Sequence, residues 1–93
     1  MRTIERTNIF RRDFKREKAG RHKHEIDVLL STLISLLAKN SALLEKNRDH
    51  GLGGEWQDHR ECHLKPDLPL IYRKPSLEVL QLVRLGSHSE LFG

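Results

Sequence analysis

The hydrophobic pattern changes its period near residue 51, and this change limits the folds that the chain can adopt. Before this point apolar residues recur every three or four positions, as in an amphipathic helix. After it apolar and polar residues alternate, as in strands with one buried face. Helices followed by strands predict an α+β fold, in which the helices pack on a sheet. Ninety-three residues suffice for one domain, expected to span 1–93, and are too few for two.

Two helices and one short strand are expected before the change of period. Residues 2–7 alternate weakly and predict a strand. A first helix is expected over residues 8–18, with Asn8 as its N-cap and Gly20 just beyond its end. A second is expected over residues 24–39. Its apolar stripe consists of Ile26, Leu29, Leu30, Leu33, Leu36 and Leu37.

Three strands are expected after the glycine-rich stretch 51–54. Their ranges are Glu55–Leu64, Leu68–Lys74 and Leu77–Leu85. The turns between them, at Pro66-Asp67 and Pro75-Ser76, are too short for crossover helices, so the strands should be antiparallel neighbours. The sequence therefore predicts two N-terminal helices packed on an antiparallel sheet.

Alternation divides the side chains of the first of these strands between two faces. The face expected to join the core holds Trp56, Cys62 and Leu64. The face expected to point outward or into a cleft holds His59, Glu61 and His63. In the last strand Arg84 has the same parity as His88, so these groups could meet at one end of the sheet.

The net charge of +4 is concentrated at the N-terminus. Residues 1–24 hold nine basic and three acidic residues, a net charge of +6, against −2 for the rest of the chain. This distribution indicates a surface for a polyanion. A single cysteine excludes a disulfide-stapled scaffold, and no apolar run is long enough to span a membrane. We expect a soluble, cytoplasmic protein without a secretory signal.

Histidine near a basic surface suggests acid–base chemistry on a phosphate. Cleavage of RNA by its own 2′-hydroxyl needs a base, an acid and cationic donors for the charge that develops on phosphorus. Histidine titrates near neutral pH and can act in both proton transfers, while arginine offers a planar fork of donors. The substrate supplies the nucleophile, so we expect neither a metal nor a cofactor.

A zinc site is the alternative chemistry. His59, Cys62 and His63 are close in sequence, but strand alternation separates Cys62 from the two histidines, and no second pair of ligands follows at finger-like spacing. No phosphate-binding glycine loop is present either. The remaining histidines, His22, His24 and His59, are expected on the surface.

A dense run of residues in the second half resembles one known family. The run reads Asp49-His50, Leu52-x-Gly54-x-Trp56, Arg60-Glu61-Cys62-His63-x-x-Pro66-Asp67, Leu70-Ile71-Tyr72 and Leu82-x-Arg84-x-Gly86-x-His88-x-Glu90-Leu91-Phe92. It resembles the YafQ branch of the RelE/ParE superfamily, the toxins of bacterial type II toxin–antitoxin modules. The resemblance is specific over residues 49–92. It implies a RelE-like fold and a ribosome-dependent endoribonuclease that cuts mRNA in the A site and stops translation.

The resemblance also implies roles for individual residues. The catalytic candidates are His50, His63, Asp67 and His88, and the candidates for phosphate or RNA contact are Arg84, Phe92, Arg60 and Trp56. We expect His88 to be the general acid, Asp67 or His63 the base, and His50 with Arg84 the groups that stabilise the phosphate. Phe92 is expected to stack on or orient a base.

The implied partners are the 70S ribosome, mRNA and a cognate antitoxin of ribbon-helix-helix type, whose complex with the toxin would repress its own operon. Ribosomal RNA would contact the basic first helix through Arg11, Arg12, Lys15, Arg16 and Lys18. Two alternatives remain at this stage. A ParE-like toxin acting on DNA gyrase would lack the histidine cluster, and a non-catalytic RNA-binding module would leave the histidines unexplained.

Overall fold

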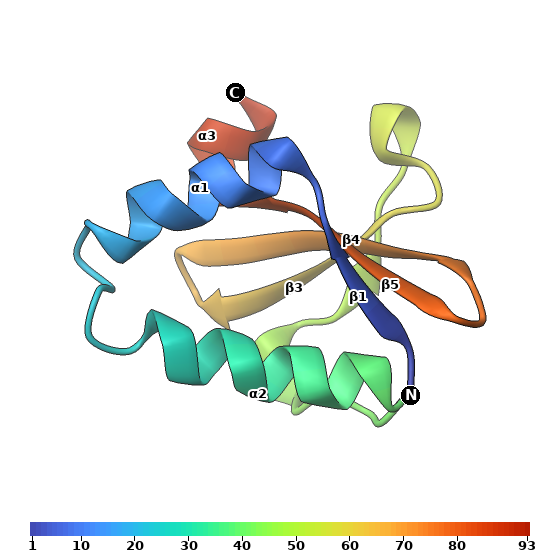
Figure 1. Ribbon diagram of the computed structural model, residues 1–93. Helices are drawn as coiled ribbons and strands as arrows, with labels where there is room; N and C mark the ends of the chain where they lie inside the picture. Colours follow the sequence, from blue (N-terminus) through green and yellow to red (C-terminus); the bar gives the residue numbers. More distant parts are fainter.

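The computed structural model describes residues 1–93 as one sheet with helices packed against it (Figure 1). The strands are β1 (Thr3–Arg6), β2 (His50–Gly51), β3 (Arg60–Lys65), β4 (Leu68–Ser76) and β5 (Val79–Leu85). The helices are α1 (Asn8–Lys18), α2 (Ile26–Ala38) and α3 (His88–Phe92), with short 3₁₀ turns η1 (Glu45–Asn47) and η2 (Gly54–Trp56). The predicted α+β class is confirmed.

The sheet has the order β1-β5-β4-β3-β2. Strands β3, β4 and β5 are antiparallel neighbours, as expected from their short turns. The expectation of a purely antiparallel sheet is wrong at one edge, because β1 pairs with β5 in parallel. A parallel pair needs a long crossover connection, and here α1, α2 and the other strands all lie between the two partners in sequence.

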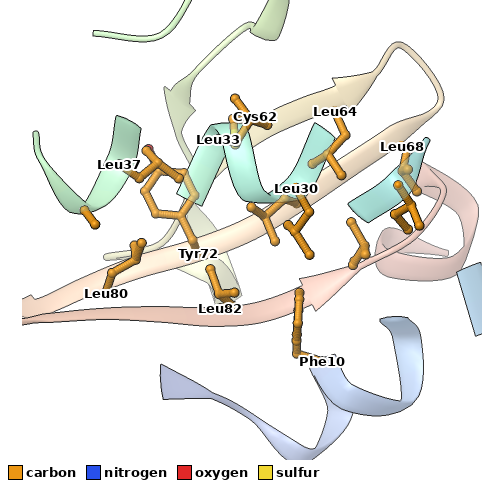
Figure 2. Close-up of a cluster of buried hydrophobic side chains, with 14 residues drawn as sticks. Phe10, Leu30, Leu33, Leu37, Cys62, Leu64, Leu68, Tyr72, Leu80 and Leu82 are labelled. Carbon is orange, nitrogen blue, oxygen red and sulfur yellow. The ribbon is translucent and has the colours of Figure 1, made fainter. Parts of the chain in front are cut away.

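The apolar stripe of α2 and the inward side chains of β3, β4 and β5 form one core (Figure 2). Phe10 of α1 belongs to the same cluster, so both long helices cover one face of the sheet. A register shift between β4 and β5 lets Leu82 and Leu85, three residues apart, both be fully buried. No helix is both long and apolar enough to cross a membrane.

The N-cap of α1 lies one residue earlier than predicted. Thr7, not Asn8, is the N-cap, and its hydroxyl accepts a hydrogen bond from the Phe10 amide at 2.9 Å. The same hydroxyl donates to the Val83 carbonyl at 2.8 Å. Both residue types cap helices well, and the position of β1 beside β5 selects the threonine.

The predicted strand Glu55–Leu64 is half wrong, because its first part forms η2 and a turn and β3 begins at Arg60. Gly54 and Asp58 have φ angles of 60° and 72°, in the left-handed region, and these two positions break the extended chain. Trp56 therefore lies outside the sheet and is half-buried, so its assignment to the core face is wrong. Cys62 and Leu64 do join the core.

Helix α3 was not expected from hydrophobic periodicity, because five residues are too few to show it. Its start carries a local sequence signature. Ser87 and Glu90 form a capping box, in which each side chain accepts a hydrogen bond from the other residue's backbone amide.

A buried ion pair joins α1 to β5. Asp13 is 2% exposed and accepts hydrogen bonds from Arg84 Nε at 2.8 Å, Arg84 Nη2 at 3.2 Å and the Leu85 amide at 3.0 Å. Burial alone would raise the pKa of Asp13, but these bonds and the nearby Arg84 charge outweigh it, so the pKa lies below its ordinary value. The predicted phosphate ligand Arg84 thus has its donor fork turned to a carboxylate of its own chain.

Asp13→Asn is expected to lower the free energy of unfolding at pH 7 by about 3 kcal/mol, because it leaves part of the Arg84 charge unpaired. A native pKa below the unfolded value gives stabilisation that is complete above about pH 4 and is lost as the pH falls through the native pKa. Urea unfolding of both proteins at pH 7, 5 and 3 measures this. The exposed Asp27→Asn serves as control and should cost less than about 1 kcal/mol. An Asp13→Asn loss equally large at pH 3 and pH 7 would contradict the assignment.

Candidate active site

The site is built around the carboxylate of Glu61 on β3. Glu61 and His63 lie two residues apart and therefore share a face of the strand. They are 3% and 6% exposed, so this face does not point outward, and His63 lines a pocket. His63 Nε2 lies 2.9 Å from Glu61 Oε1, and the His63 carbonyl accepts a hydrogen bond from Asn47 of η1 at 2.8 Å.

Two further histidines reach the same oxygen atom from other elements. His50 lies opposite Glu61 in the β2–β3 register, and its Nε2 is 3.2 Å from Glu61 Oε1. His88, the first residue of α3, places its Nε2 at 3.5 Å. The rings of His63 and His88 meet edge to face, with centroids 5.3 Å apart. The structure thus brings together three of the four predicted catalytic residues.

The three imidazole rings differ in solvent exposure and therefore in their access to a substrate. The His63 side chain is 7% exposed, while those of His50 and His88 are 51% and 53% exposed. Both ring nitrogens of His50 face oxygen acceptors, because its Nδ1 lies 3.1 Å from the Gly51 carbonyl. Both ring nitrogens of His50 are therefore engaged by groups of the protein itself.

Glu61 remains a carboxylate in this setting. Its burial would raise the pKa, but the hydrogen bonds from His63 and His50 and the nearby charge of His88 lower it below the ordinary value. Glu61 was not among the predicted site residues. The one feature of the sequence that could have indicated its role is its position between two histidines on one face of the predicted strand. Alternation alone does not distinguish such a residue from a solvent-exposed glutamate.

An aromatic group borders the histidines. Phe92 of α3 stacks on His88 with centroids 5.9 Å apart, and Trp56 meets Phe92 edge to face at 6.2 Å. Trp56 also contacts His59, at 5.3 Å. Phe92 is 42% exposed, so part of its ring is open to a ligand.

The segment that carries His50 is anchored by a second polar cluster. The hydroxyl of buried Tyr72 donates to Asp49 Oδ1 at 2.5 Å, and Arg60 Nε lies 3.3 Å from both groups. Burial and the neighbouring Asp49 carboxylate raise the pKa of Tyr72, so its hydroxyl keeps its proton. Arg60 uses its Nε here, and its side chain remains 45% exposed.

Asp67 does not join the three histidines in any contact of this structure. Its carboxylate pairs with Arg21 and lies 3.2 Å from Nε2 of His22. Partial burial would raise the pKa of Asp67, but the His22 hydrogen bond and the Arg21 charge lower it. The expectation that His22 lies on the surface is wrong, since it is 8% exposed and holds this turn.

Basic residues that the sequence did not single out line a pocket next to His63. Lys46 of η1, Arg48, His63 and Pro66 surround a space of about 300 Å³. Arg48 reaches this position through a left-handed backbone, with φ 48°. The pocket contains no acidic residue, so it suits an anion such as a phosphate group.

The predicted basic surface of α1 divides into two groups. Arg11, Arg12 and Lys15 are exposed and form no ion pair. Lys18 pairs with Asp27 of α2, and Arg16 pairs with acidic groups on α1 and α3. Three of the five predicted docking residues therefore remain available to an external polyanion.

Glu61, His63 and His88 also form a candidate metal-ligating group, because one ligand atom of each lies within 4.8 Å of the others. Two imidazoles and a carboxylate suit zinc or copper. The alternative set of His59, Cys62 and His63 is not assembled. Cys62 is fully buried in the core, and burial raises the pKa of its thiol.

Residues 2–93 match the family described as "Bacterial toxin of type II toxin-antitoxin system, YafQ". The mRNA interferase toxin YafQ of Escherichia coli strain K12 is 33% identical over 93 residues, which cover 99% of this chain and 97% of that protein.

Two solved structures illustrate the same fold. The E. coli DinJ–YafQ toxin–antitoxin complex has a chain that superposes with a TM-score of 0.82 at 32% identity, covering 99% of this chain and 98% of that one. The metal-bound toxin from Helicobacter pylori superposes with a TM-score of 0.82 at 45% identity, covering 99% and 100%.

Glu61→Gln is expected to shift the ring ¹⁵N signals of His50, His63 and His88 together, because all three rings face one oxygen atom. The signals of exposed His24 should not move. Long-range ¹H–¹⁵N spectra of the imidazole rings make the measurement, with the exposed Glu55→Gln as matched control. A shift confined to His63 would show that the other two rings do not depend on the carboxylate.

Proposed function

Since the chain belongs to the YafQ family of toxins from bacterial type II toxin–antitoxin systems, we propose that it is an endoribonuclease that cleaves mRNA. The observation that carries this proposal is the meeting of three histidines on the Glu61 carboxylate, beside the exposed ring of Phe92. Imidazoles transfer protons at neutral pH, and an aromatic ring stacks on unpaired bases of RNA.

Cleavage would proceed by attack of the substrate's own 2′-hydroxyl on the adjacent phosphate. The half-exposed His88 is the general acid for the 5′-leaving oxygen, and Phe92 and Trp56 hold a flanking base. The half-exposed His50 stabilises the charge on the phosphate. Glu61 touches no substrate in this scheme. Its carboxylate holds the three imidazole rings in position.

The sequence allows either Asp67 or His63 as the general base, and the contacts of the two residues favour His63. Asp67 is tied to Arg21 and His22, and its lowered pKa makes it a weak proton acceptor. His63 lines the basic pocket formed with Lys46 and Arg48. That pocket can take the phosphate contact first assigned to Arg84, while exposed Arg60 remains a candidate for RNA contact.

The substrate complex is the translating ribosome, with mRNA presented in the A site of the 70S particle in the cytoplasm. The exposed cations Arg11, Arg12 and Lys15 lie on α1, where they can contact ribosomal RNA without base recognition. A ParE-like action on gyrase would not use the histidine cluster, and a passive RNA-binding module would not require it.

A cognate antitoxin is the second partner. E. coli YafQ is solved in complex with its antitoxin DinJ. The corresponding partner here would be a ribbon-helix-helix protein that blocks the toxin and, with it, represses the operon of both. Relief of toxicity by the product of the neighbouring gene tests this partnership.

A transition metal is a second candidate ligand of the site. The toxin from H. pylori is solved with a bound metal, and Glu61, His63 and His88 form a suitable ligand group. A metal would take up imidazole lone pairs that acid–base catalysis needs. Binding of metal and cleavage of RNA would therefore exclude one another at this site.

His88→Ala is expected to reduce mRNA cleavage on ribosomes by about 10²-fold or more, the usual contribution of a general acid. Mapping of the 5′ ends of cleaved mRNA, with and without ribosomes, makes the measurement. A chelator selective for transition metals is present throughout. The surface variant His24→Ala should cleave like the wild type, and circular dichroism checks folding. Full cleavage by His88→Ala would remove it from the acid role.

Reversal of Arg11, Arg12 and Lys15 to glutamate is expected to weaken ribosome association at least about tenfold near 0.1 M salt, because each phosphate contact releases counterions. The dependence of affinity on salt should flatten as well. Co-sedimentation with ribosomes over a salt series measures both. Reversal of Lys23 and Lys39, which lie outside this surface, is the control. Unchanged association at moderate salt would argue against docking through α1.

A further inference from the structure

The Arg16 side chain contacts three elements at once. It lies in the last turn of α1, and its guanidinium contacts α1, the end of β5 and α3. Its Nη1 is 3.1 Å from Asp13 Oδ1, its Nη2 donates to the Leu85 carbonyl at 3.0 Å, and its Nε is 3.0 Å from Glu90 Oε2. A side chain with this many fixed partners is poorly suited to grip an external polyanion.

The junction between β5 and α3 is shaped to accept this guanidinium. A Cβ atom on Gly86 would lie 2.7 Å from Arg16 Nη2 and 3.0 Å from Glu90 Oε1. Any other residue at position 86 would push these groups away. The glycine thus leaves room for the end of the Arg16 side chain, and α3 lies beside α1 (Figure 1).

Glu90 links this contact to the stability of α3. One carboxylate oxygen accepts the Ser87 amide at 2.8 Å in the capping box, and the other faces Arg16. A helix of five residues cannot hold itself in water. Besides the capping box, it depends on burial of Leu91 and on the arginine that fixes the capping carboxylate.

Helix α3 begins with His88 and ends with Phe92, so its placement sets both of these side chains against Glu61 and Trp56. We propose that Arg16 is a positioning residue of the active site, which holds α3 in register and thereby places His88 and Phe92 on the RNA. This inference rests on the proposed nuclease function. It also replaces the expectation that Arg16 is a ribosome-docking cation.

Steady-state cleavage of ribosome-bound mRNA separates the two roles. Arg16→Gln is expected to lower kcat about tenfold to a hundredfold with KM nearly unchanged, as small misplacements of catalytic groups do. Arg12→Gln should raise KM and leave kcat unchanged, because that residue only docks. Lys23→Gln, a matched loss of charge outside both groups, should change neither. A rise in KM alone for Arg16→Gln would overturn the proposal.

Arg16→Lys keeps the charge but cannot reach Asp13, Leu85 and Glu90 with one ammonium group. It should therefore lose kcat almost as Arg16→Gln does, while binding ribosomes with the salt dependence of the wild type. Full recovery of kcat by lysine would show that charge alone is needed and would overturn the positioning role.

Hydrogen exchange gives a readout that does not need activity. The Leu91 amide donates to the Ser87 carbonyl at 3.0 Å inside α3. In Arg16→Gln its exchange should quicken about tenfold or more, while amides of β4 and β5 stay protected. Equal loss of protection across the sheet would mean general destabilisation and would overturn the proposal. If the wild-type protein cleaves no mRNA, the proposed function fails, and unchanged α3 exchange in Arg16→Gln would refute the positioning separately.

Discussion

The candidate active site depends on one ionised carboxylate in a buried position. Removing a carboxylate from water is costly unless charged or hydrogen-bonding partners replace the water. For Glu61 those partners are three imidazoles from β2, β3 and α3, which also hold its pKa low. The same contacts stabilise the buried charge of Glu61 and bring the proton-transfer groups together. The geometry of the site therefore follows from the electrostatics of one residue.

A second buried carboxylate, Asp13, organises a separate charged network that reaches α3. It fixes Arg84 and, through Arg16, reaches the capping carboxylate Glu90 of α3. The two networks meet at α3, whose first residue belongs to the histidine cluster. The short helix α3 is therefore held by both networks, and Asp13 and Arg16 of α1 contribute to the fold.

Local patterns predicted the elements well wherever several residues agreed. The stripe of α2 extends over many positions, so both the type of element and its buried face were correct. The strands β4 and β5 were also expected, and their antiparallel pairing is confirmed. The errors occur where one or two residues determine the local backbone conformation. Gly54 and Asp58 adopt left-handed backbone angles that end the expected strand and move Trp56 out of the core. Alternation cannot reveal such a break.

The sequence alone determined the α+β class, the antiparallel order of three strands and the identity of the histidines that meet. It did so because these properties follow from hydrophobic period, turn length and a dense local motif. Only the tertiary structure decided which charged groups pair. Arg84 binds Asp13 from 71 positions away, Asp67 binds His22 from 45 positions away, and Glu61 collects its histidines from three elements. The sequence tells which residues are charged, but the partner of each charged residue depends on how the elements pack. The same packing decides whether a charged side chain is solvated or forms a buried ion pair.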